Sequence, residues 1–311
     1  MPTNSDIEWT GPTWNPIRAR NVATGKLGHF CIKASGECKF CYAEGINQVW
    51  GTGIPYRAQD LKAGKVELFL DEKVLREPLR WRRLKTPFVF PCSMTDLFGE
   101  FVPDVWIDKI FAIMARRPDL TFQVLTKRAA RMRAYFDEMK ADHQGLNINR
   151  LGVAGLAMGI TGPAGPYPSC PLPNVWLGVS VGRRRHVDRF DDLLACPAAV
   201  HWASLEPLLE DIGDLTPWIS RNPRLNWAVI GLESRGGRYP GADLILPILR
   251  QLDHWRVPGF VKQLGRGWAR IQNRGLKKDD PRRVHPKGGD PAQWRPEFRV
   301  REFPETKRAP A

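Results

Sequence analysis

The sequence predicts an α/β protein built on a partial or open (β/α) barrel of about six parallel strands. From Lys85 onward, short apolar runs alternate with amphipathic stretches, which is the pattern of repeated βα units and a parallel sheet. The apolar runs are hydrophobic throughout, as expected of strands that are covered on both faces. A doubly wound open sheet stays an alternative, because hydrophobic periodicity does not decide whether a sheet closes.

The expected strands are short and apolar, and in chain order they are residues 88–91, 121–125, 175–179, 200–205, 227–230 and 259–261. An earlier strand would end near Cys31. The expected helices between them are residues 103–117, 184–195 and 243–255, and an earlier helix over 72–84 is interrupted by Pro78. Apolar residues at three- to four-residue spacing give these stretches one apolar face.

Two segments depart from this rhythm. Residues 142–173 are rich in Gly and Pro and are expected to form a long inserted loop, which would suit a lid. Residues 265–311 are basic and rich in Pro and Gly. We therefore expect a barrel over residues 1–264 and a C-terminal extension over 265–311 that packs on it.

Composition narrows the class of protein and of partner. Of the 311 residues, 42% are hydrophobic and 26% charged, as in a soluble globular protein. No apolar run reaches the roughly 18 residues of a membrane span, and the N-terminus lacks a secretory pattern, so we expect a cytoplasmic protein that does not enter membranes. The net charge of +14 favours a polyanion, and nucleic acid is the expected partner, with a merely solvated basic surface as the alternative.

Three of the six cysteines, Cys31, Cys38 and Cys41, lie within eleven residues. That clustering indicates a metal site in a reducing compartment, and thiolates suit iron–sulfur clusters or zinc. A structural zinc site needs a fourth ligand, for which His29 is the nearest candidate. Three thiolates on a cubane cluster would leave one iron open. The spacing alone therefore leaves three alternatives for this site: an iron–sulfur cluster, a zinc ion, or thiols that bind no metal.

Polar residues follow the predicted strands, at the edge where ligands bind in α/β barrels and open α/β sheets. Taken singly, each is equally well explained as a helix cap or an ion-pair member. Helix capping, however, does not explain the positively charged residues that follow these strands. We predict a binding rim formed by Ser93, Asp96, Lys127, Ser180, Glu206 and Glu233.

Several short blocks together resemble a known family. They are residues 7–10, 13–16, 41–44, 93–98, 121–128, 176–180, 204–209, 260–263 and 299–304. With the three cysteines, they resemble a phage- and prophage-associated three-cysteine-motif family that is largely uncharacterised and is grouped with radical S-adenosylmethionine (SAM) enzymes. The commonest radical SAM loop has three residues between its first two cysteines, whereas six separate Cys31 from Cys38 here. The half of the motif that runs from Cys38 to Cys41 does match.

The resemblance implies a 4Fe-4S cluster on Cys31, Cys38 and Cys41, SAM as cofactor, and an electron donor such as flavodoxin or ferredoxin. Such an enzyme generates a 5′-deoxyadenosyl radical. If SAM binds, its amino group needs an acceptor such as Asp96 or Glu206, and its carboxylate needs a cation such as Lys127. The ribose hydroxyls could meet Ser180.

Basic charge and the phage context make a nucleic-acid base the expected substrate, in modification or in lesion repair. Cys92, which follows a strand, would then be a hydrogen-atom donor, with a structural thiol as the alternative. The residues expected to contact nucleic acid are Lys277, Lys278, Arg282, Arg283 and Trp294. Two other classes stay open: a zinc-stabilised nucleic-acid-binding protein without catalysis, and an iron–sulfur sensor or partner of a phage-defence system.

Overall fold

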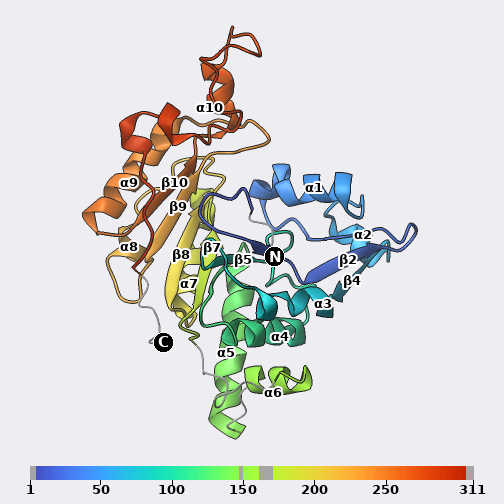
Figure 1. Ribbon diagram of the computed structural model, residues 1–311. Coiled ribbons are helices and arrows are strands. Elements are labelled where there is room, and N and C mark those ends of the chain that lie inside the picture. Colours follow the sequence, from blue (N-terminus) through green and yellow to red (C-terminus); the bar gives the residue numbers. More distant parts are fainter. Residues whose placement is uncertain (1–4, 147–149, 161–170, 306–311) are drawn as a thin grey trace. The chain divides into compact units, whose positions relative to one another are not determined.

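A computed structural model describes residues 5–146, 150–160 and 171–305 (Figure 1). Its main sheet has seven strands in the order β1-β5-β6-β7-β8-β9-β10. Their bounds are β1 Thr13–Trp14, β5 Phe88–Pro91, β6 Thr121–Thr126, β7 Val175–Ser180, β8 Val200–Leu205, β9 Trp227–Gly231 and β10 Gly259–Gln263. The pairs β1–β5, β5–β6, β8–β9 and β9–β10 are parallel. Strands β1 and β10 are the two edges, and the predicted class, α/β with a partial or open (β/α) barrel of parallel strands, is confirmed.

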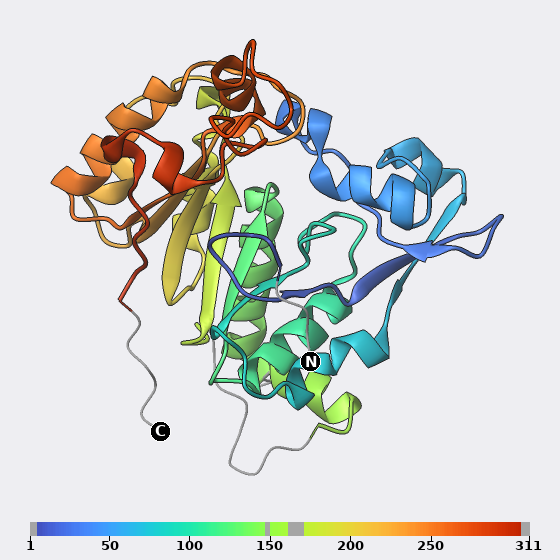
Figure 2. The ribbon, with the colours of Figure 1, turned by 45° about the horizontal axis from the view of Figure 1, so that its top comes forward.

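All six strands predicted within this sheet are present, and their ends differ from the prediction by two residues at most. The seventh, β1, is only two residues long and gave no pattern to find. The strand expected near Cys31 is the short β3 (Leu27–Gly28), which lies in a separate antiparallel sheet. That sheet has the order β3-β2-β4, with β2 at Ile17–Asn21 and β4 at Val66–Leu70 (Figure 2, blue to cyan).

A helix follows each strand from β5 to β10, and the sequence predicts those after β5, β7 and β9. These helices are α4 (Asp104–Ala115), α5 (Ala129–Leu146), α7 (Arg189–Ala195), α8 (Thr216–Ile219), α9 (Ile245–His254) and α10 (Gly265–Gln272). Before the sheet lie α1 (Tyr42–Trp50), α2 (Ala58–Lys62) and α3 (Glu72–Leu75), with the 3-10 turns η1 (Gly36–Phe40) and η2 (Glu77–Arg80). The short turns η3 (Arg184–His186), η4 (Ala242–Leu244), η5 (Pro291–Gln293) and η6 (Pro296–Phe298) complete the chain. The interruption at Pro78 is real, because that residue stands in η2, after α3 has ended.

The prediction of one loop over residues 142–173 is wrong in its first half. Helix α5 continues to Leu146, and α6 occupies Arg150–Ala157. Leu151, Ala154 and Met158 are buried at three- and four-residue spacing, which is a helical signal that the neighbouring Gly and Pro residues obscured. Residues 161–170, which include Cys170 and the centre of the proposed lid, lie outside the described part of the chain.

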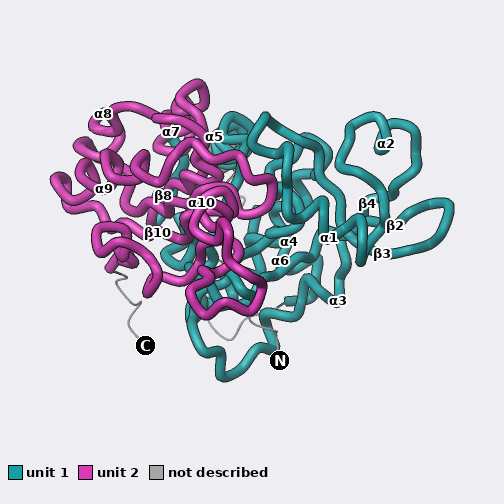
Figure 3. Tube along the Cα trace, turned by 90° about the horizontal axis from the view of Figure 1, so that it is seen from above, with its two compact units in different colours: residues 1–178, 195–199, 309–311 teal, residues 179–194, 200–308 magenta. Residues whose placement is uncertain are grey.

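The chain forms two compact units, residues 1–178 with 195–199 and residues 179–194 with 200–308 (Figure 3). The boundary falls inside β7 rather than near residue 264. In the second unit the C-terminal segment lies beside β10: the amide of Val261 donates to the carbonyl of Val300, and the amide of Glu302 donates to the carbonyl of Gly259, each over 2.8 Å. The basic C-terminal part therefore belongs to the same unit as β8 to β10. Within the described ranges, no helix is both long enough and apolar enough to cross a membrane.

Candidate functional site

The cysteine loop lies in the first unit, between the small antiparallel sheet and α1. Cys31 comes three residues after β3, Cys38 lies in η1, and Cys41 is the N-cap residue immediately before α1. The loop is closed locally, since the amide of Cys38 donates to the carbonyl of Ser35 over 3.0 Å. A helix N-terminus favours negative charge, so the position of Cys41 suits a thiolate.

The thiols are held in an apolar setting. Cys31 and Cys41 pack against a buried cluster that includes Phe30, Ala43 and Tyr56. Burial raises the pKa of Cys31 to about 12, and the nearby Asp96 carboxylate adds to this rise. The thiols of Cys41 and Cys38 also raise the pKa of Cys31, so the three sulfur atoms lie within electrostatic range of one another.

Cys41 has partners that favour its charged form. Burial raises its pKa, but the backbone amides of Glu44 and Ala43 and the ammonium of Lys127 act in the opposite direction. Lys127 is half-buried, and its ammonium has no ion-pair partner among the residues the structure describes. It is thus a cation beside the cysteine loop whose charge is not already neutralised.

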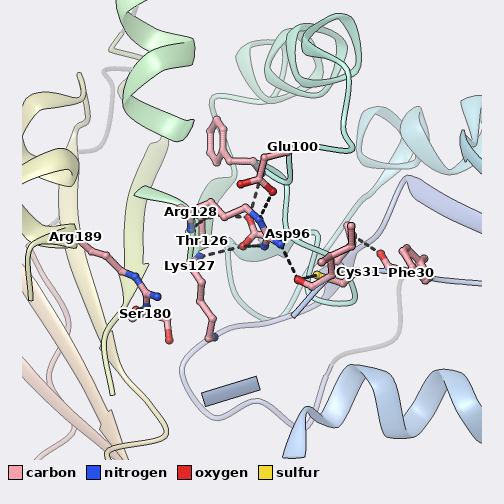
Figure 4. A network of polar contacts seen from close by, with 12 residues as sticks. Phe30, Cys31, Asp96, Glu100, Thr126, Lys127, Arg128, Ser180 and Arg189 are labelled. Atoms are coloured by element: carbon pink, nitrogen blue, oxygen red, sulfur yellow. Dashed lines mark hydrogen bonds and ion pairs between the residues drawn. The ribbon is translucent and has the colours of Figure 1, made fainter. Parts of the chain in front are cut away.

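Two residues from the ends of β5 and β6 hold the backbone on both sides of Cys31. The Thr95 hydroxyl donates to the carbonyl oxygen of Phe30 over 2.5 Å. The Nη2 of Arg128 donates to the carbonyl oxygen of Ile32 over 2.6 Å (Figure 4). Because a backbone carbonyl on each side of Cys31 is held in this way, the position of its sulfur depends on the residues that follow these two strands.

Asp96 is the centre of this network. Its Oδ1 accepts from the Thr126 hydroxyl over 2.6 Å and from the amide of Phe98 over 3.1 Å. Its Oδ2 accepts from the amide of Lys127 over 3.0 Å and from Nη1 of Arg128 over 3.1 Å. Both oxygens are therefore occupied by protein donors. We expected Asp96 to contact a cofactor, but its contacts are those of a residue that orients Arg128.

Arg128 also contacts Glu100, to which its Nε donates over 2.7 Å. Burial of the guanidinium lowers its pKa, but the charges of Asp96, Cys31 and Glu100 outweigh this effect and raise it. Arg128 therefore stays fully charged beside Cys31, where it favours the thiolate form of that cysteine.

The loop that follows β5 is tied to α1 and to β1. The Tyr42 hydroxyl donates to the carbonyl of Ser93 over 2.5 Å, and the Tyr56 hydroxyl donates to the carbonyl of Met94 over 3.1 Å. Asn15 bonds the Ser93 hydroxyl and accepts from the amide of Met94 over 2.9 Å. We did not single out Asn15, Tyr42 or Tyr56 from the sequence, although the first two stand in the blocks 13–16 and 41–44.

Cys92 directly follows β5 and is 3% exposed. Its φ of 55° is unusual for a residue with a side chain, and its amide donates to the carbonyl of Trp14 over 2.7 Å. Burial, and then the Asp96 carboxylate, raise the pKa of this thiol. Cys92 is thus a protonated thiol, close enough to Asp96 to be affected by its charge.

The three cysteines supply sulfur ligands of the kind that both iron–sulfur clusters and zinc take. In the described ranges, no three His, Cys, Asp or Glu side chains converge on one ion position. A cubane cluster takes each thiolate on a different iron, so its ligands need not meet at one point. The Nδ1 of His29 lies 3.3 Å from the carbonyl of Ile17, and burial, with Arg18 nearby, lowers the pKa of this imidazole to about 4. His29 is therefore a half-buried residue whose imidazole is neutral at neutral pH.

The other three predicted rim residues lie in the second unit. The Ser180 hydroxyl donates to the carbonyl of Glu206 over 2.9 Å. The Glu206 carboxylate accepts from Lys262 over 2.9 Å and from Gln263 over 2.6 Å, and Arg238 binds the buried Glu233. Ser93, Asp96 and Lys127 thus share the first unit, and Ser180, Glu206 and Glu233 share the second. Those in the second unit are paired with neighbours.

The predicted nucleic-acid residues have unequal settings. Lys277 and Lys278 are exposed. Arg282 is paired with Asp280 at 2.7 Å, and Arg283 donates to the carbonyls of Leu276 and Lys277. The prediction that Trp294 stacks on bases is wrong. Trp294 is 2% exposed, its indole donates to the carbonyl of Gly288, and it belongs to the core of the second unit.

Comparisons with known proteins give one result. The model of a family described as "Protein of unknown function (DUF5131)" matches residues 4–288. No curated protein and no solved structure matches the chain.

Proposed function

Since the chain belongs to the family described as "Protein of unknown function (DUF5131)", we propose its activity from its own residues: it is a radical SAM enzyme that acts on a base of nucleic acid. The observation that supports this most directly is the way Cys31 is held. Three soft ligands share one loop, two of them pack against an apolar cluster, and the backbone on both sides of Cys31 is held by residues that follow β5 and β6.

In this proposal Cys31, Cys38 and Cys41 hold a 4Fe-4S cluster. Such a cluster, when bound, supplies the reductive cleavage of SAM to a 5′-deoxyadenosyl radical, with the electron coming from a donor such as flavodoxin or ferredoxin. The chain's own part is to hold the loop, to exclude water and to bind the cofactor. The apolar cluster with Phe30 and Tyr56 packs against Cys31 and Cys41, which lowers the dielectric constant around these two thiols.

Two further residues have roles suited to this chemistry. The ammonium of Lys127 is a suitable partner for the carboxylate of SAM, because it lies beside the cysteine loop and carries an unneutralised charge. Cys92 keeps its hydrogen, because burial disfavours its thiolate. A protonated thiol has the hydrogen atom that a base-centred radical would need for repair.

Anaerobic reconstitution with iron and sulfide, followed by SAM and a reductant, tests the proposal. We expect a brown protein that retains iron and sulfide and releases 5′-deoxyadenosine. A variant with Cys31, Cys38 and Cys41 changed to Ala serves as the negative control. Zinc retention without iron would support the non-catalytic zinc-stabilised alternative. A cluster that never cleaves SAM would support the sensor alternative.

A further inference from the structure

The region from α10 to Gly288 is strongly basic. Residues 265–288 contain eight Lys and Arg against two Asp. Arg266 and Arg270 lie on α10 four residues apart, and Arg274 continues the spacing in the turn that follows, where its amide donates to the carbonyl of Ile271. Residues four apart lie on one side of a helix, so Arg266 and Arg270 share a face of α10, and Arg274 follows just beyond the end of the helix. We call these three residues the arginine row.

A second segment adds charge beside this row. Nη1 of Arg266 donates to the carbonyl oxygen of Arg235 over 3.1 Å, which joins α10 to the loop after β9. In the same loop Gly237 has a φ of 91°, and a Cβ there would lie 2.8 Å from Nη1 of Arg270. The glycine lets this loop lie against the arginine row, so Arg235 belongs to the same surface.

The charges of this surface are not neutralised within the described part of the second unit. Its six cations are exposed and have no carboxylate partner there: Arg235, Arg266, Arg270, Arg274, Lys277 and Lys278. The nearby Arg282 and Arg283 differ, because Asp280 and two carbonyls engage them.

A row of like charges has a cost for the fold. Like charges four residues apart destabilise a helix by roughly 0.2–0.5 kcal/mol per pair. Arg266 also stands in the first turn of α10, where the helix dipole disfavours a cation. A merely solvating surface would mix acids with bases, whereas a row of unpaired guanidinium groups suits a polyanion.

We propose that α10 and the loops beside it bind the phosphate backbone of a nucleic-acid strand; this inference rests on the proposed function and locates its substrate. Four residues of helix rise about 6 Å. Phosphates along one strand of B-DNA are about 3.4 Å apart along the axis, so successive arginines match every second phosphate. The guanidinium fork binds phosphate through two hydrogen bonds.

This surface recognises the backbone rather than bases. Trp294 is buried, and Trp268 packs against Gly288, where an added Cβ would lie 2.9 Å from its ring. Neither indole is therefore set for stacking on bases. Binding should accordingly be strongly dependent on salt and independent of sequence.

The test compares two triple variants that lose the same net charge. R266Q/R270Q/R274Q removes the row. R184Q/R221Q/R295Q removes three cations of the same unit that are paired with Asp211, Asp191 and Asp243. Fluorescence anisotropy with labelled single-stranded and duplex oligonucleotides, over a salt series, gives the log–log slope for each protein. Circular dichroism and thermal melting confirm that both variants fold.

We expect the slope for the row variant to be smaller by about 2 to 3, at roughly 0.7–0.9 per lost contact, and that of the control to change much less. An equal decrease of this slope in the two variants would overturn the proposal, because net charge alone would then explain binding. So would no binding by the native protein at low salt, or binding to phosphatidylserine vesicles that oligonucleotides do not compete away. Iron content and 5′-deoxyadenosine release, measured on the row variant without oligonucleotide, stay as in the native protein and report separately on the proposed function.

Discussion

Arg128 donates a hydrogen bond of 2.6 Å from its Nη2 to the carbonyl oxygen of Ile32, the residue after Cys31. The same guanidinium is paired with Asp96 at 3.1 Å, so one side chain connects the end of β6, the loop after β5 and the cysteine loop. The position of Cys31 is thereby coupled to the sheet, although 96 residues separate Arg128 from Ile32.

Arg128→Lys should weaken cluster binding. Lysine keeps the charge but cannot reach Ile32, Asp96 and Glu100 at once, since it lacks the planar fork. Loss of a residue that orients a metal ligand typically lowers affinity about 10- to 100-fold. Iron retained after titration with a chelator measures this, with Arg133→Lys, in an exposed pair with Asp137, as the control. Equal iron retention in the two variants would show that Arg128 does not position the ligand.

Replacing any one of Cys31, Cys38 and Cys41 by Ala should abolish cluster binding, because a site of three thiolates has no spare ligand. Cys196→Ala, a change to a buried cysteine outside the cysteine loop, should leave it intact. Iron and sulfide content after reconstitution decides the matter. Full iron in any of the first three variants would remove that cysteine from the ligand set.

Lys127→Gln should keep the cluster but weaken SAM binding. A hydrogen bond to a charged group contributes about 1.5–3 kcal/mol, which corresponds to roughly 10- to 100-fold in affinity. Isothermal titration of the reconstituted protein measures the change. Lys278→Gln, an exposed lysine in the second unit, is the control and should bind SAM as the native protein does. An unchanged affinity for Lys127→Gln would mean that another cation meets the carboxylate.

Cys92 should resist alkylation in the folded protein. The thiolate is the reactive form, and burial both shields this sulfur and raises its pKa. Iodoacetamide at mildly alkaline pH, followed by mass spectrometry, should modify Cys92 only after unfolding. Rapid modification of the native protein would contradict this. If Cys92 is the hydrogen donor, the Cys92→Ala variant should still cleave SAM but should not form the base product.

Asp60 should stabilise the fold at neutral pH and lose that effect in acid. Hydrogen bonds from Arg57 at 2.6 Å and Lys65 at 3.1 Å lower its pKa, the former being the larger cause, although burial opposes them. A carboxyl whose pKa is lower in the folded state stabilises the fold above its unfolded pKa, near 3.9, and loses that contribution as pH falls through the folded value.

The difference in free energy of unfolding between the metal-free native protein and its Asp60→Asn variant should therefore be constant at about pH 5 and above. It should shrink below about pH 4. Urea unfolding at several pH values measures it. Asp137→Asn, in an exposed pair, should cost little at any pH. A difference that persists unchanged into acid would show that the Asp60 charge is not its source.

The sequence by itself determined six strands of the main sheet and the helices α4, α7 and α9, because an apolar run and an amphipathic period are local properties of a few neighbouring residues. It also placed three thiols on one loop. Six residues separate Cys31 from Cys38 and two separate Cys38 from Cys41, so the three cannot lie far apart. It failed for β1, which is too short for any pattern, and for α6, whose helical period lies between Gly- and Pro-rich neighbours.

Only the tertiary structure decided which polar residues act together. Asp96 and Lys127 both follow strands, but the fold occupies both oxygens of Asp96 and leaves the ammonium of Lys127 without an ion-pair partner in the described chain. Likewise, Trp294 and Lys278 stand in the same basic segment, yet one is buried and the other exposed. The physical reason is that a hydrogen bond or a buried contact depends on distance in space, and residues far apart in the chain meet only when the sheet has assembled.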